Sequence, residues 1–162
     1  MGSVFQIAQL VLGLMFYTLA GQALMAAFLG PHRFGNNIYM AMDKVVWVPK
    51  RLAGLLVPDV GSALVRRLIA VAVALVSWFA IFPKLAPVLA YWGYLRLEIV
   101  VFSWLLLAVL LAGMALTVPP VWLRSFTRGL LAMGLIEYGN RLLIFVAERA
   151  GWIQLAPAAG TG

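Results

Sequence analysis

Four stretches of this chain are so apolar that they restrict it to a fold solvated by lipid. Each approaches or exceeds the ~20 residues that an α-helix needs to cross the hydrocarbon of a bilayer. They run from about 4 to 29, 63 to 82, 95 to 117 and 127 to 149. Hydrophobic residues make up 65% of the 162 residues and charged residues only 10%, unlike a soluble domain. The sequence therefore predicts an all-α, polytopic transmembrane helical bundle of about four spans.

The chain has no room for a second, water-soluble domain. We expect a single transmembrane domain over residues 1–156, followed by a disordered tail over 157–162 that is rich in alanine and glycine. A short, apolar chain with basic connections also gives no reason to expect a nucleic-acid partner, because topology and anionic lipid account for its +7 formal charge.

The connection after the first span has the pattern of an amphipathic interfacial helix over about 37–57. Its apolar side chains fall on one half of a helical wheel and its polar ones on the other. The apolar half holds Ile38, Ala41, Met42, Val45, Val48, Leu52, Leu55 and Leu56, and the polar half holds Asn36, Asp43, Lys44, Lys50, Arg51 and Gly54. Pro49 lacks an N–H, so we expect a kink or break near Val48.

Basic residues are distributed unequally between the two sides of the predicted bundle. One side has Arg33, Lys44, Lys50, Arg51, Arg66, Arg67, Arg124 and Arg128, and the other has Lys84, Arg96 and Arg149. The positive-inside rule then places both termini in the periplasm of a bacterial inner (cytoplasmic) membrane. Among the basic residues we expect anionic lipid to contact Lys44, Lys50, Arg51, Arg66 and Arg67.

The fourth span carries charges that lipid does not tolerate singly. Glu137 and Arg141 are one turn apart, so they can pair, and Asn140 lies beside them. An antiparallel hairpin of the third and fourth spans would bring Glu98 to the depth of Arg141. We therefore expect an intramembrane polar cluster of Glu98, Glu137, Asn140 and Arg141, serving as a folding device, a contact for a partner chain or an ion relay.

The first span has no charge but carries a stripe of amide and small side chains. The stripe comprises Gln6, Gln9, Gly13, Tyr17 and Ala20. Membrane helices pack through such residues because lipid supplies no hydrophobic drive between helices. The stripe therefore predicts either packing within this protein or a face for another subunit.

No cofactor, metal site or catalytic set is expected within the chain. Cysteine is absent, which excludes disulfides and thiolate-bound metals, and His32 is the single histidine. His32 at the end of the first span is a weak candidate for a haem or chlorophyll ligand and more simply a polar helix end. The sequence has no phosphate-binding glycine loop and no nucleophile–histidine–acid set.

Part of the N-terminal half resembles a known family. Asn37-Ile38-Tyr39, Val48-Pro49-Lys50-Arg51 and Val57-Pro58, between two apolar helices, resemble one half of the YggT family of small bacterial integral membrane proteins. The resemblance covers about residues 4–82, and residues 118–128 repeat only its prolines and arginines. It implies a membrane factor linked to envelope or complex assembly, without catalytic residues.

Together these features favour a non-enzymatic accessory, assembly or stabilising subunit that contacts other integral membrane proteins. A small transporter or channel component using Glu98, Glu137 and Arg141 is the first alternative. A subunit of an electron-transfer or photosynthetic complex that shares a cofactor is the second.

The predicted orientation can be tested directly because the chain lacks cysteine. Single-cysteine variants Arg124→Cys and Trp152→Cys are labelled in intact spheroplasts with a membrane-impermeant maleimide. We expect labelling at position 152 and none at position 124 until the membrane is permeabilised. Labelling of position 124 from outside would reverse the orientation.

Overall fold

The computed structural model describes residues 2–57, 61–91, 97–117 and 119–153, and the described residues contain helices and no strand. The elements are α1 (Gly2–Leu29), the 3₁₀ helix η1 (Gly30–Gly35), α2 (Asn37–Val45), α3 (Trp47–Leu56), α4 (Ala63–Tyr91), α5 (Leu97–Thr117) and α6 (Pro120–Arg149). Within these residues, three stretches are long and apolar enough to cross a membrane: Ser3–Leu29, Ala63–Pro87 and Val121–Arg149. The predicted tail at 157–162 lies outside the described residues.

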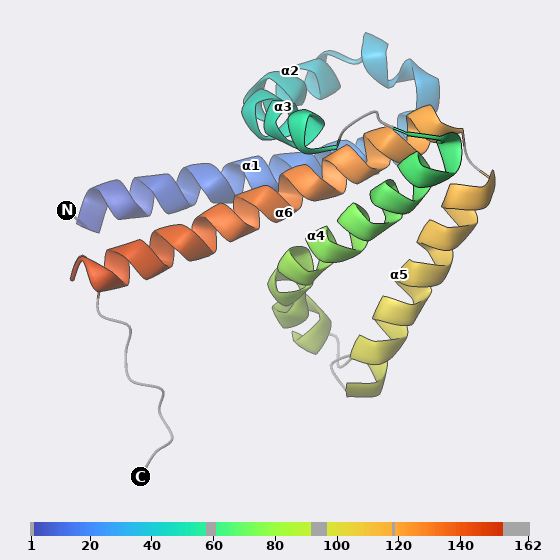
Figure 1. Ribbon diagram of the computed structural model, residues 1–162. Helices are drawn as coiled ribbons and strands as arrows, with labels where there is room; N and C mark the ends of the chain where they lie inside the picture. The colour runs from blue at the N-terminus through green and yellow to red at the C-terminus, as the bar shows by residue number, and fades with distance from the viewer. Residues whose placement is uncertain (1, 58–60, 92–96, 118, 154–162) are drawn as a thin grey trace.

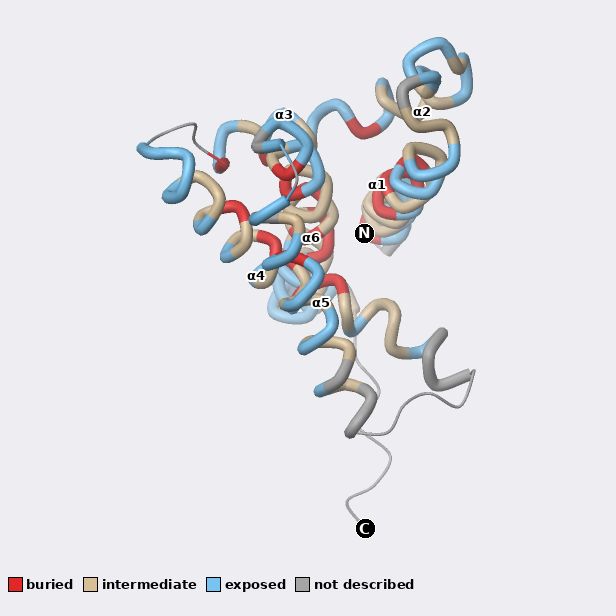
Figure 2. The backbone as a smooth tube through the Cα atoms, turned by 90° about the vertical axis from the view of Figure 1, so that its right-hand side faces the viewer, coloured by how far each residue is buried: buried red, intermediate tan, exposed pale blue. Residues whose placement is uncertain are grey.

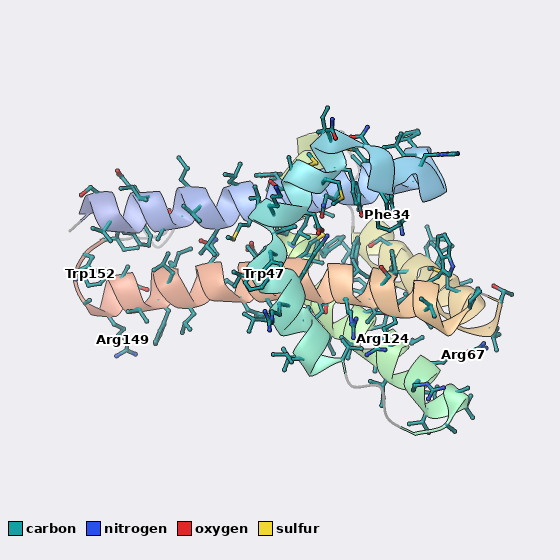
Figure 3. All side chains as sticks on the ribbon, turned by 90° about the horizontal axis from the view of Figure 1, so that it is seen from above. Phe34, Trp47, Arg67, Arg124, Arg149 and Trp152 are labelled. Atoms are coloured by element: carbon teal, nitrogen blue, oxygen red, sulfur yellow. The ribbon has the colours of Figure 1, made fainter. Side chains whose placement is uncertain are left out.

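The long helices are arranged around α6. Helices α1 and α6 run antiparallel side by side, α4 diverges from α6 along its length, and α5 lies mainly against α4 (Figure 1). The short pair α2–α3 crosses over α1 and α6 (Figure 3). Arg67 and Arg124 lie toward one end of this arrangement, and Arg149 and Trp152 lie at the other (Figure 3).

The core forms where α1, α3, α4 and α6 meet. Its buried members are Phe16, Leu19, Val46, Ala53, Ile81, Ala132 and Ile136. Figure 2 shows buried positions on the faces of α1, α4 and α6 that turn toward each other. In contrast, α5 buries Leu111 but exposes most of its other large apolar side chains that are described.

Small residues allow α4 and α6 to approach closely. Ala70, Ala74 and Ser77 are buried along α4, and the Ser77 hydroxyl donates to the Val73 carbonyl at 2.7 Å. A Cβ atom added to Gly134 of α6 would lie 3.3 Å from the Ser77 Cα and 3.2 Å from its Cβ. Close backbone approach of this kind replaces the hydrophobic drive that is missing between helices in lipid.

The segment after α1 breaks at Val46, which is earlier than the expected site near Val48. Val46 has φ −100° and ψ 16° and separates α2 from α3. Pro49 then lies in the first turn of α3, where its missing N–H has no intrahelical acceptor in any case. The Asn36 side chain caps α2 by accepting from the Tyr39 N–H at 3.0 Å.

The buried face of α3 consists of Pro49 and Ala53, flanked by Val46 and Val57. The larger apolar residues that define the predicted wheel are mainly exposed, and Leu55 is 75% exposed. Small and compact side chains therefore pack on α6, while bulky ones point away from the protein.

Helix α4 is longer than the sequence predicts. The expected second span ends at about Phe82, but the helix continues through Pro83 and Pro87 to Tyr91. Each proline interrupts one hydrogen bond of the helix, and neighbouring helices can compensate for such a loss. The extension places Lys84 inside the helical assembly.

Gly134→Ala should destabilise the protein by about 1–3 kcal/mol, because the new methyl group meets the Ser77 backbone. The matched control is Gly139→Ala on the same helix, where no atom lies within 4 Å of the added Cβ. Thermal unfolding of both variants in one detergent measures the difference. Equal unfolding temperatures for the two variants would contradict the close contact between α4 and α6.

Candidate functional site

The most unusual chemical feature of the described residues is an ion pair between α4 and α6. Lys84 Nζ donates to Glu137 Oε2 at 3.0 Å, and the two side chains are 21% and 10% exposed. A charge within hydrocarbon costs roughly 2.5–3.5 kcal/mol on insertion scales, and an opposite charge at hydrogen-bond distance offsets this cost. The pair therefore fixes the register of two apolar helices.

Arg141 completes the cluster from the next turn of α6. Its Nε lies 3.9 Å from Glu137 Oε1, and its Nη2 donates to the Ala80 carbonyl of α4 at 3.3 Å. Ala80 lies just before Pro83, where the ring removes one backbone donor from the helix. Arg141 thus connects α6 to the backbone of α4 at the point where proline weakens the helix. Its side chain is 45% exposed, so the cluster reaches the surface here.

Helix α1 covers the third side of Lys84 with two aromatic rings. The Lys84 Nζ lies 4.7 Å from the centroid of Phe16 and 5.9 Å from that of Tyr17. Ring faces attract cations, and the attraction is stronger where water is excluded. Lys84, Glu137, Arg141, Phe16 and Tyr17 are called the lysine cluster below.

The lysine cluster lies deep along the helices. From Arg67 to Lys84 the rise of α4 is about 25 Å, and from Arg124 to Glu137 the rise of α6 is about 20 Å. If the arginines mark one membrane surface, the cluster falls in the opposite half of the bilayer.

Sequence reasoning identified Glu137 and Arg141 but missed Lys84. The sequence places Lys84 beyond the second span, which it predicts to end at about Phe82, and so on the outer side of the membrane. A signal was present, since Lys84 continues the 3- and 4-residue spacing of the buried positions Ala70, Ala74, Ser77 and Ile81. The Glu98 side chain lies outside the described residues, and Asn140 is half-buried.

The predicted stripe of α1 lies at the margin of the packed face. Gln6 is exposed, Gln9, Gly13 and Ala20 are half-buried, and Tyr17 is 66% exposed. The helix instead buries Phe5, Phe16, Thr18, Leu19 and Gln22. Packing within the described residues therefore uses mainly the neighbouring face, and the stripe as a partner face stays a prediction.

A second polar group joins α1 to the α2–α3 pair. Asp43 of α2 accepts hydrogen bonds from Lys50 Nζ of α3 at 2.5 Å and from Gln22 Nε2 of α1 at 3.3 Å. Gln22 also donates to the Tyr39 carbonyl at 3.2 Å. Burial raises the pKa of the Asp43 carboxyl, but the hydrogen bond and charge of Lys50, with the Gln22 hydrogen bond, outweigh burial and hold that pKa below its usual value. Asp43 therefore stays ionised at neutral pH.

The other basic residues expected at lipid have varied surroundings. Lys44 is exposed, and the Arg51 guanidinium lies 5.0 Å from the Trp47 ring centroid. Arg66 donates to the Gly61 carbonyl at 3.0 Å, and Arg67 donates to the Leu116 carbonyl of α5 at 3.4 Å.

His32 is exposed in η1. Among the described residues no group of three or more histidine, aspartate or glutamate side chains could hold a metal ion.

A comparison of the chain with protein families found no match, and searches of curated proteins and of solved structures found none either.

Glu137→Gln should destabilise the protein by about 3–5 kcal/mol, because it leaves the Lys84 charge uncompensated among apolar helices. The double variant Lys84→Met with Glu137→Leu removes both charges and should recover most of the loss. Thermal unfolding in detergent measures both effects. The ion pair would have no structural role if the single variant unfolded at the wild-type temperature.

Proposed function

We propose that this protein is a non-enzymatic accessory, assembly or stabilising subunit of a larger membrane protein complex. The observation that supports this most is the empty space beside the Cα atom of Gly13, on the stripe that also holds the exposed Tyr17. Glycine in a helix costs about 0.5–1 kcal/mol relative to alanine, yet no atom lies within 4 Å of where a Gly13 Cβ would be. In membrane helices small residues permit close approach of another backbone, and an open Gly13 leaves that approach to a partner.

Tyr17 supports the same proposal. It lies one turn after Gly13 on the same stripe, with a polar hydroxyl on a largely exposed ring in the middle of an apolar helix. Hydrocarbon offers no hydrogen-bond partner to a phenol, whereas a polar side chain or backbone carbonyl of another subunit does. Gln9, one turn before Gly13, adds an amide to this surface.

The proposed membrane arrangement has four spans with both termini outside. Helix α5 has 21 residues, about 31 Å of rise, which suits a span, and Ser103–Met114 within it is apolar. The α2–α3 pair is proposed to lie at the cytoplasmic surface of a bacterial inner membrane, with exposed Leu52 and Leu55 in the lipid and Lys44 and Arg51 among anionic headgroups. The resemblance to the YggT family is consistent with this arrangement and remains part of the proposal.

A transporter or channel component is the second candidate, and the buried ionisable groups of the lysine cluster favour it. Ion flux into proteoliposomes that is abolished by Lys84→Met with Glu137→Leu, a pair expected to preserve the fold, would support this candidate.

The accessory function predicts that Gly13→Leu releases the protein from its complex, because the larger side chain blocks close approach. The matched control is Gly113→Leu on α5, where no atom lies within 4 Å of the added Cβ either. Native gels of membranes solubilised in mild detergent should show wild type and control in a larger assembly and Gly13→Leu as the free protein. A wild-type protein that migrates alone and monodisperse would contradict the proposal.

A further inference from the structure

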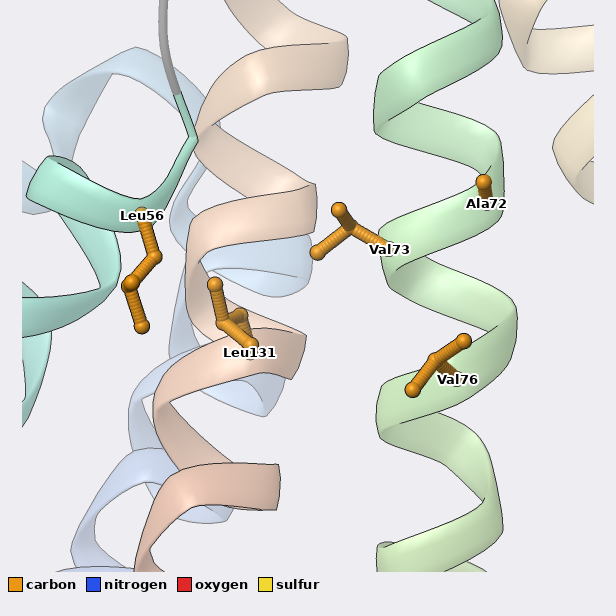
Figure 4. Close-up of a pocket in the computed structure, with 5 residues that line it drawn as sticks. All are labelled: Leu56, Ala72, Val73, Val76 and Leu131. Carbon is orange, nitrogen blue, oxygen red and sulfur yellow. The ribbon is translucent and has the colours of Figure 1, made fainter.

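An apolar groove opens between the end of α3 and helices α4 and α6. It has a volume of about 260 Å³ and is lined by Leu56, Ala72, Val73, Val76 and Leu131, all of them aliphatic (Figure 4). An engineered cavity of about 150 Å³ already holds a benzene molecule. The groove is therefore large enough for a segment of an acyl chain.

The groove has a basic residue toward one end, on one of the long helices that line it. Arg67 lies at the same end of α4, about 8 Å of helix rise before Ala72, but its guanidinium is held by the Leu116 carbonyl of α5. On α6, Arg128 precedes Leu131 by about one turn, and its guanidinium carbon lies 3.9 Å from the position of a Gly54 Cβ on α3. Arg128 thus places positive charge at the end where a lipid headgroup would lie, and the aliphatic side chains lie deeper along α4 and α6.

We infer that this groove is a binding site for one anionic phospholipid, with its phosphate at Arg128 and one acyl chain along Ala72, Val76 and Leu131. A bilayer already solvates acyl chains, so the groove gains little from the hydrophobic effect. Selectivity must come from the charge at its end and from the fit of the chain.

This site differs from a general attraction of the basic surface for anionic lipid. A surface attraction depends on total charge and falls equally when any exposed basic residue is removed. A groove depends on both its arginine and its aliphatic lining, so a neutral substitution in the lining must also reduce binding.

The test measures lipid retention by native mass spectrometry of the purified full chain in micelles with equimolar phosphatidylglycerol and phosphatidylcholine. We expect one retained phosphatidylglycerol on the wild type. Ala72→Phe, which fills the groove from an exposed position, should abolish retention, and Leu105→Phe, exposed on α5 and not part of the groove lining, should not. Val76→Phe is a second filling variant, should Ala72→Phe fail to fold.

The headgroup is tested separately. Arg128→Gln should lower retention about fivefold, the factor expected when one basic side chain beside a phosphate is lost, and Arg128→Lys should keep it. Arg149→Gln, at the other end of α6, controls for net charge. Equal retention of the two lipids, an unchanged Ala72→Phe variant, or equal losses for Arg128→Gln and Arg149→Gln would each overturn the site.

Discussion

The arrangement of the long helices depends on where the charge of Lys84 finds its partner. In an apolar chain almost any rotation or translation of one helix on another buries similar side chains, so hydrophobicity alone does not select a register. Lys84 removes this freedom, because only one register brings Glu137 within 3.0 Å of its ammonium group. Arg141 and the two aromatic rings of α1 then fix the same point from the other sides. The ion pair therefore determines the register of α4 on α6 more than it adds to the free energy of unfolding.

The close approach at Gly134 acts with this pair. Ser77 and Gly134 bring the backbones of α4 and α6 together. This contact lies about two turns before Lys84 on α4 and about one turn before Glu137 on α6. The two contacts have different physical origins, dispersion in one case and charge in the other, and both depend on side chains at positions that face the same neighbour. Together they explain the close packing of α4 on α6.

The features that the sequence predicted correctly depend only on residues close together in the chain. Long apolar runs gave the helical class, and the spacing of Glu137 and Arg141 placed two charges on one face, because both follow from helix geometry alone. The break was predicted near Val48 and lies two residues earlier, at Val46, and the continuation of α4 past Pro83 was not predicted, since tertiary contacts decide how a proline is accommodated. The partner of Glu137 was missed for the same reason.

The helical wheel of residues 37–57 gives only part of the arrangement of this segment. It separated apolar from polar side chains, but it could not distinguish apolar groups that meet lipid from those that meet protein. Ala53 and Val46 are buried because they are compact enough for α6 to approach, whereas bulkier Leu55 points outward. In this segment the position of a residue relative to α6, which hydrophobicity alone does not reveal, decides which apolar side chain is inside.

The contact of Asp43 with Lys50 and Gln22 spans the break between α2 and α3. The Asp43 carboxylate accepts hydrogen bonds from both α3 and α1. These hydrogen bonds therefore set the rotation of the two short helices about their axes relative to α1. An amphipathic helix that has no contacts with the rest of the protein can rotate until its apolar face meets the lipid. At the membrane surface proposed above, the Asp43 contacts would hold α2 and α3 in one orientation relative to α1, so the lipid would have to adapt to the side chains that this pair exposes.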